Sequence, residues 1–163
     1  MIPDYRCFYK ENFGKGVFDM NKRLLLDNIR RNYEEDNINV IQYLHQLSNE
    51  SENDIEDIMI SYDFQAGSYT EDYKGNEKAR NEYLSRAVSV IDGLEGKKES
   101  FLECGVGEAT IIVPLLKLLK TNFKFCAGID ISWSRIKYAQ KFTAESGNGG
   151  VELAVGDMFN LPF

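Results

Sequence analysis

The feature that most constrains the fold is a change of rhythm near residue 99, where short apolar runs begin to alternate with amphipathic helical segments. The apolar runs at 100–104, 123–129 and 151–155 have the length of strands, and a glycine or an aspartate follows each of them. Between these runs, two stretches repeat apolar residues at helical spacing. Strand, helix, strand, helix, strand is the pattern of parallel βαβ units. We therefore predict an α/β fold with a Rossmann-like parallel sheet.

The first 96 residues have a different texture, because their apolar residues recur only at helical spacing. Helical stripes lie within 24–33, 38–47, 55–60 and 76–91, and a polar break at 48–54 separates the second stripe from the third. The sequence thus predicts a helical N-terminal cap or lid over residues 1–96 and a cofactor-binding half-domain over residues 97–163.

Composition and charge exclude several classes of function. The chain has 163 residues with 19 Lys and Arg against 26 Asp and Glu, a formal charge of -7 that repels phosphate backbones, so we expect no nucleic-acid partner. Three cysteines without a spaced pair and a single histidine argue against a disulfide framework and against a metal centre. Neither a signal-peptide pattern nor an apolar run long enough for a membrane span is present. We expect a cytoplasmic protein without a membrane partner.

Three polar elements follow the three predicted strands. Gly105 and Gly107 follow the first strand, Asp130 follows the second, and Asp157 follows the third. Glycines at a strand-to-helix turn let a ligand approach the backbone, and the following helix offers free N–H groups. A carboxylate at the end of the second strand is placed to accept hydrogen bonds from ribose hydroxyls. Because the carboxyl ends of parallel strands share one edge, the sequence predicts a pocket for a nucleoside cofactor there.

The residues around the glycines discriminate between cofactors. A dinucleotide fingerprint needs a third glycine, and Thr110 occupies that place. The first strand also carries an acid, Glu103, beside the glycine turn, where it would repel a pyrophosphate but attract a cationic amino-acid group. This combination favours S-adenosylmethionine (SAM) over a nicotinamide cofactor.

At these positions the sequence resembles the class I SAM-dependent methyltransferases. The resemblance rests on Phe101-Leu-Glu103-Cys-Gly105-Val-Gly107-Glu, on Cys126-Ala-Gly128-Ile-Asp130-Ile131-Ser132 and on Val155-Gly156-Asp157-Met158-Phe159-Asn-Leu161-Pro162-Phe163. It implies SAM as cofactor and S-adenosylhomocysteine as product. It further implies that Glu103, Gly105 and Gly107 line the methionine portion, that Asp130 holds the ribose, that Ile131 flanks the adenine, and that Asp157 and Met158 contact the adenine edge and face.

Upstream, Ser61-Tyr62-Asp63-Phe-Gln65-Ala66-Gly67-Ser68-Tyr69 is similar to a segment that lies across the cofactor mouth in this family, so the resemblance makes Tyr62, Gln65 and Tyr69 candidates for a lid. Ala66-Gly-Ser-Tyr69 with Ile131-Ser-Trp133-Ser-Arg135 resembles more narrowly the bacterial methyltransferases of surface-glycan biosynthesis. The sheet of the family continues beyond three strands. The resemblance therefore implies a truncated chain that lacks a C-terminal half or associates with copies of itself.

The expected activity is methyl transfer from SAM to a small molecule, such as a sugar or glycan precursor, although this chain alone could be inactive. No catalytic base is evident, and Asp63 or a tyrosine near the N-terminus is a candidate. Arg135 is expected to pack or to be solvated at the start of a helix, with ligand contact as the alternative. Two other functions remain open: a non-catalytic SAM-binding scaffold and an NAD-dependent oxidoreductase.

Overall fold

The computed structural model describes residues 22–36, 38–48, 52–53, 55–147 and 149–161, and the chain divides into two compact units, residues 1–49 and 50–163. In the first unit, α2 (Lys22–Asp36) packs against α3 (Val40–Ser48), with Ile29 and Val40 buried. Both helices coincide with predicted helical stripes. The boundary predicted at residue 97 falls inside the second unit, between its helical part and its sheet.

The second unit contains a three-stranded parallel sheet in the order β1-β2-β3. The strands are β1 (Ser100–Cys104), β2 (Phe125–Asp130) and β3 (Val151–Val155). Glu103 pairs with Gly128, and Asp130 pairs with Val155, so the strands end at one common edge. The predicted α/β fold with a Rossmann-like parallel sheet is confirmed. All three strands lie where the apolar runs predicted them, although β2 begins two residues later and includes Asp130.

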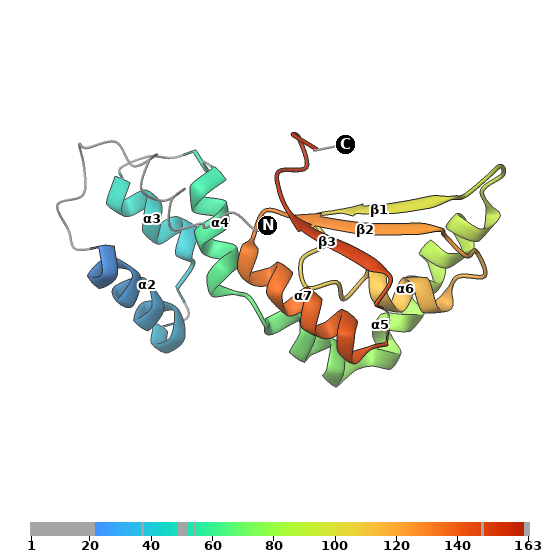
Figure 1. Ribbon diagram of the computed structural model, residues 1–163. Coiled ribbons are helices and arrows are strands. Elements are labelled where there is room, and N and C mark those ends of the chain that lie inside the picture. The colour runs from blue at the N-terminus through green and yellow to red at the C-terminus, as the bar shows by residue number, and fades with distance from the viewer. Residues whose placement is uncertain (1–21, 37, 49–51, 54, 148, 162–163) are drawn as a thin grey trace. The chain divides into compact units, whose positions relative to one another are not determined.

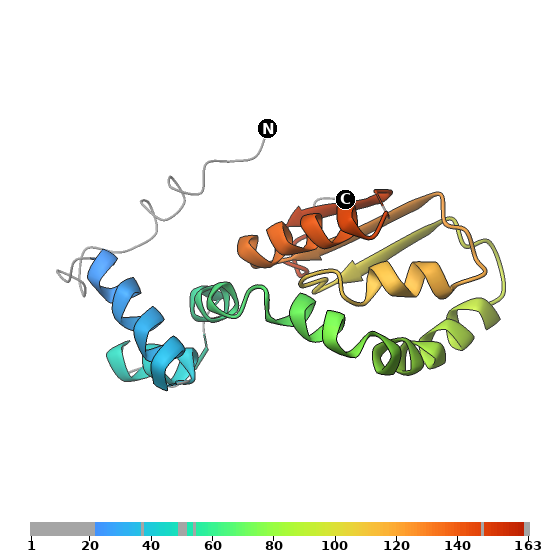
Figure 2. The same cartoon turned by 90° about the horizontal axis from the view of Figure 1, so that it is seen from below.

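Helices cover one face of this sheet (Figure 1). After β1 comes α6 (Ile112–Leu118), and after β2 comes α7 (Trp133–Glu145), as parallel βαβ units require. Seen from the side of the helices, α7 lies over β3 and β2, while α6 packs on α5 (Ser68–Gly93) (Figure 2). Between these layers lies the apolar core. Its buried members are Tyr73, Val106, Ala109, Ile112, Val113, Ile136, Ala139 and Phe142.

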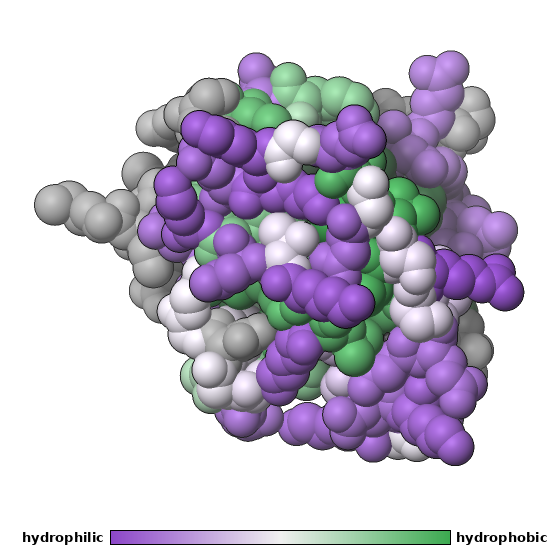
Figure 3. Space-filling model, turned by 90° about the vertical axis from the view of Figure 1, so that its right-hand side faces the viewer, coloured by the Kyte–Doolittle hydropathy of each residue, from purple (hydrophilic) through white to green (hydrophobic). Residues whose placement is uncertain are grey.

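No described helix covers the opposite face of the sheet (Figure 1). Leu102 on β1 and Phe125 on β2 are consequently exposed. At the amino end of the sheet, hydrophilic side chains lie over and between apolar ones (Figure 3). In the described part of the chain, no helix is long and apolar enough to cross a membrane.

Two helices precede β1 in the second unit, α4 (Ile55–Phe64) and α5. The helix predicted for 76–91 in fact begins at Ser68, because Asn76 takes non-helical dihedral angles that produce a kink rather than a terminus. Tyr83, which the helical spacing places on the inner face, is exposed, while its neighbour Leu84 is buried. The prediction for Tyr83 was wrong because α5 buries only a narrow stripe.

Candidate functional site

The loop after β1 turns back tightly toward β2. The N–H groups of Gly105 and Val106 both donate to the carbonyl oxygen of Ile129, at 2.8 and 3.0 Å. Gly105 (φ 73°) and Gly107 (φ 54°) adopt left-handed backbone conformations that glycine tolerates best. Gly128 allows Val106 of this loop to pack closely on β2, because a Cβ atom at Gly128 would lie 2.6 Å from Cγ2 of Val106. The glycine loop therefore lies directly over the ends of β1 and β2.

A turn separates the glycines from the helix that follows them. Ala109 has φ 60° and its N–H donates to the carbonyl oxygen of Val106, which makes a turn. For this reason α6 begins only at Ile112. The N–H of Gly107, which lies in the loop before this turn, donates to the carboxylate of Asp130.

Asp130 ties the glycine loop to the end of β2. One carboxylate oxygen accepts the N–H of Gly107 at 2.8 Å, and the other accepts the N–H of Ser132 at 2.9 Å. The residue is only 7% exposed. An ionised carboxylate has about four acceptor positions, so two contacts leave each oxygen with capacity for one further donor.

Glu103 lies near the end of β1, and its Oε2 atom is buried without a hydrogen-bond partner among the described residues. Burial raises the pKa of this carboxyl to about 7, the N–H of Ile112 opposes the shift, and the negative charge of Asp130 adds to it. A cationic group at the glycine loop would favour the ionised form.

Glu108, which immediately follows the glycine loop, is the functional residue that the sequence analysis missed. Its side chain is 1% exposed, and its two carboxylate oxygens accept the N–H groups of Gly67 (2.8 Å) and Thr70 (2.7 Å). Gly67 is the N-cap of α5, so Glu108 satisfies the free donors of that helix and complements its dipole. The one sequence signal was an acid placed among apolar residues directly after the glycines.

The structure brings the three lid candidates together around Arg135. The guanidinium carbon lies 4.3 Å from the ring centroid of Tyr62 and 4.8 Å from that of Tyr69. Nη2 of the same residue donates to Oε1 of Gln65, at 3.4 Å. Arg135 is 7% exposed, so of the two expectations for it at the helix start, packing is observed and solvation is not.

Asp63 fixes the start of α7. Its Oδ1 atom accepts the hydroxyl of Ser132 at 2.5 Å and the N–H of Ser134 at 3.3 Å. Ser132 is the N-cap of α7, and its own hydroxyl oxygen accepts the N–H of Arg135. Asp63 therefore has an evident structural role. A tyrosine near the N-terminus, the other candidate base, lies outside the described residues.

The third strand end joins the same edge of the sheet. The N–H of Gly156 donates to the carbonyl oxygen of Asp130 at 2.9 Å, which places the loop after β3 beside the end of β2. Asp157 accepts the N–H of Phe159 within its own turn. Met158 is half-exposed, and Ile131 is partly buried. All ten predicted cofactor residues thus lie at the strand ends or in the α4–α5 segment that contacts α7.

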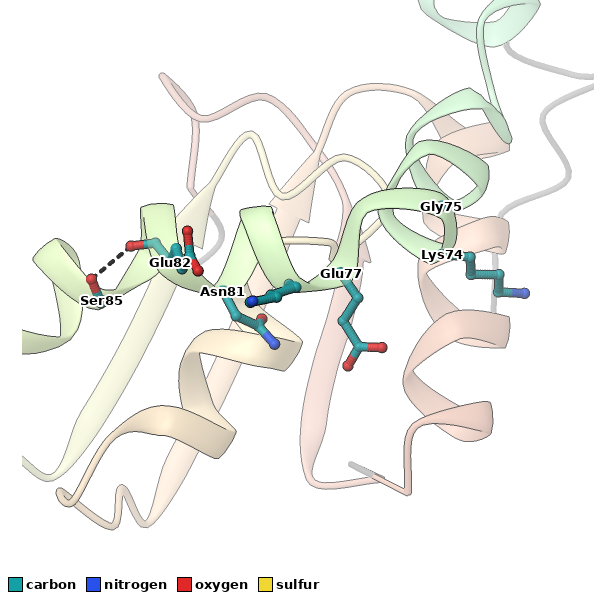
Figure 4. A pocket seen from close by; sticks show the side chains of 7 residues that line it. Lys74, Gly75, Glu77, Asn81, Glu82 and Ser85 are labelled. Carbon is teal, nitrogen blue, oxygen red and sulfur yellow. Dashed lines mark hydrogen bonds between the residues drawn. The ribbon is translucent and has the colours of Figure 1, made fainter.

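A separate hollow lies at the kink of α5 (Figure 4). Its lining residues all belong to α5 and include Lys74, Glu77 and Asn81. None of the predicted site residues takes part in it. Across the described residues, no group of three His, Cys, Asp or Glu side chains could hold a metal ion.

Comparison with known proteins yields structural likenesses only. No protein-family model and no curated protein matches this sequence. Among solved structures, the chain is similar to the YcgJ protein from Bacillus subtilis, with 20% identity over 49% of this chain and 32% of that one and a TM-score of 0.40. The chain is also similar to geranyl diphosphate C-methyltransferase from Streptomyces coelicolor A3(2), with 19% identity over 53% of this chain and 30% of that one and a TM-score of 0.40.

An RNA methyltransferase from Salinibacter ruber, solved with S-adenosyl-L-homocysteine, gives 21% identity over 52% of this chain and 50% of that one, with a TM-score of 0.39. The chain thus spans about a third to a half of the length of these proteins.

Proposed function

We propose that this chain binds SAM and S-adenosylhomocysteine at the shared edge of the three strands, as the cofactor-binding part of a methyltransferase. The observation that carries the proposal is the network around Asp130, whose carboxylate holds the glycine loop of β1 and whose carbonyl oxygen holds the loop after β3. Three loops of the types that contact a nucleoside ligand in α/β sheets are thereby joined at one residue.

The charges around the loop support a zwitterionic amino-acid group as part of the ligand. Glu103 offers a buried carboxylate oxygen without a partner among the described residues, and Arg135 brings a buried cation close to Gly107. A pyrophosphate would be repelled by Glu103 and by Asp130. Asp130 retains acceptor capacity for a ribose hydroxyl, and Ile131, Asp157 and Met158 would border the adenine.

When SAM is bound, its sulfonium supplies an electrophilic methyl group, so the protein mainly has to align donor and acceptor. The segment from Tyr62 to Tyr69 borders the loop and would shape the choice of acceptor. We propose a small molecule as acceptor, and the motif resemblance favours a sugar of a surface-glycan precursor.

The test is calorimetric titration of the chain with SAM, S-adenosylhomocysteine and NAD. We expect binding of the first two ligands only, and Asp130→Asn should weaken it about 10- to 100-fold, the range for losing a hydrogen bond to a charged group. Asp92→Asn is the matched control, since Asp92 also accepts two backbone N–H groups, from Lys120 and Thr121. Binding of NAD alone, or equal affinities of the two variants, would contradict the proposal.

A further inference from the structure

Arg135 is a buried cation that has no counter-ion among the described residues. Among the described residues, no carboxylate lies within ion-pairing distance of its guanidinium, and its Nε atom is buried without an acceptor. The one hydrogen bond of the guanidinium to a described residue, the neutral amide of Gln65, is long at 3.4 Å. Buried charges in folded proteins are normally paired, because an unpaired charge away from water is costly. The surroundings of this side chain therefore favour the binding of an anion.

The two tyrosine rings hold this cation without using its hydrogen-bond donors. Tyr62 and Tyr69 stack against the guanidinium at 4.3 and 4.8 Å from their centroids. Such cation–π contacts stabilise the charge and fix the plane of the group. A guanidinium has five N–H donors, and among the described residues Gln65 is the one acceptor for them. The remaining edge keeps the fork geometry that matches a planar carboxylate.

This edge lies beside the glycine loop. A Cβ atom at Gly107 would be 3.9 Å from Nη1 of Arg135, an ordinary van der Waals distance, so this edge of the guanidinium lies close to the glycine loop. Gly107 is the same residue whose N–H is held by Asp130. A ligand seated on the glycine loop is therefore within reach of the arginine.

We propose that Arg135 binds a carboxylate of a ligand seated at the glycine loop, with Tyr62 and Tyr69 fixing the plane of the guanidinium. The inference rests on the proposed function where the ligand is the cofactor, whose amino-acid portion ends in an α-carboxylate. A carboxylate on the methyl acceptor has the same chemistry, and the experiment separates the two sources.

The first arm measures the affinities of S-adenosylhomocysteine and of its decarboxylated analogue by calorimetry. If the cofactor supplies the carboxylate, the wild-type chain prefers the intact ligand by about 10- to 100-fold, and Arg135→Gln reduces that ratio to about one. Lys137→Gln is the matched control, because Lys137 is an exposed cation on the same helix that stacks 3.6 Å from the ring centroid of Trp133. This variant should keep the wild-type ratio.

The second arm titrates acetate, with acetamide as its neutral counterpart, into the isotopically labelled chain saturated with S-adenosylhomocysteine. The Nε–H resonance of Arg135 is assigned by its absence in Arg135→Gln. A saturable shift with acetate alone, combined with an affinity ratio that Arg135→Gln leaves unchanged, assigns the carboxylate to the acceptor. Arg135→Lys keeps the charge but loses the fork, so it should retain only part of either effect, and it serves if the glutamine variant does not fold.

An unchanged ratio together with no response to acetate overturns the inference. A wild-type chain that binds neither S-adenosylhomocysteine nor its analogue contradicts the proposed function instead. In that case acetate titration of the unliganded chain still decides whether Arg135 is a carboxylate site.

Discussion

Glu103→Gln tests the buried carboxyl of the site through the stability of the fold. Burial raises the pKa of Glu103 from its ordinary value of 4.5 to about 7. Below pH 4.5 the group is protonated in both the folded and the unfolded chain and has no effect. Between about pH 4.5 and pH 7 the unfolded chain ionises this group while the folded chain keeps it protonated, so the stability of the fold falls over this range and levels off above it.

The difference between 4.5 and about 7 corresponds to about 3 kcal/mol of unfolding free energy above pH 8 and about 2 kcal/mol at pH 6, at 1.36 kcal/mol per pH unit. Glutamine has the shape of the protonated glutamate and does not titrate. In urea unfolding at pH 4, 6 and 8, the unfolding free energy of Glu103→Gln should therefore increase relative to that of the wild-type chain as the pH rises. Glu152→Gln, an exposed acid on β3, is the control. A difference between Glu103→Gln and wild type that stays constant with pH would refute the reasoning.

Three further predictions follow from the same region. Binding of S-adenosylhomocysteine should strengthen between pH 6 and 8, because its ammonium group favours ionised Glu103; calorimetry in two buffers should show release of a proton at pH 6. Glu108→Ala should lower the unfolding free energy by about 3 kcal/mol or more, since it leaves two buried N–H groups unpaired, and urea unfolding checks this. Gly67→Ala should destabilise the fold by about 1–3 kcal/mol in the same assay, because the φ of Gly67 is 104° and the new Cβ would lie 2.9 Å from the ring of Tyr138. Gly75→Ala is the control and should not destabilise the fold, since a Cβ at Gly75 would lie in open space.

The sheet could be predicted because its signals are local. Each strand is a short apolar run that ends in a glycine or an aspartate, and the connecting stretches carry a helical period. Parallel pairing follows from that alternation. The start of α5 could not be found in this way, since its first turn is polar and its N-terminus depends on Glu108, 38 residues later than Thr70 in the chain.

The site was predicted at the level of its loops but not of its contacts. Asp130 was expected to face a ligand, and in the structure it also holds the N–H of Gly107. Local pattern cannot reveal this, because the bond joins the loop after β1 to the end of β2, 23 residues later in the chain. Arg135 was expected to pack or to be solvated at a helix start, and the local sequence could not decide between the two. Its burial depends instead on two tyrosines more than sixty residues earlier in the chain.

Three polar anchors connect the α4–α5 segment to the loops at the carboxyl edge of the sheet. Asp63 binds the start of α7, Glu108 binds the start of α5, and Arg135 lies between Tyr62 and Tyr69. Each anchor is formed with a residue of the loop after β1 or of the first turn after β2, the same elements that would hold the cofactor. In the proposed mode of binding, the ligand carboxylate contacts the guanidinium that Tyr62 and Tyr69 hold, so the residue that binds the ligand would also set the position of these two tyrosines.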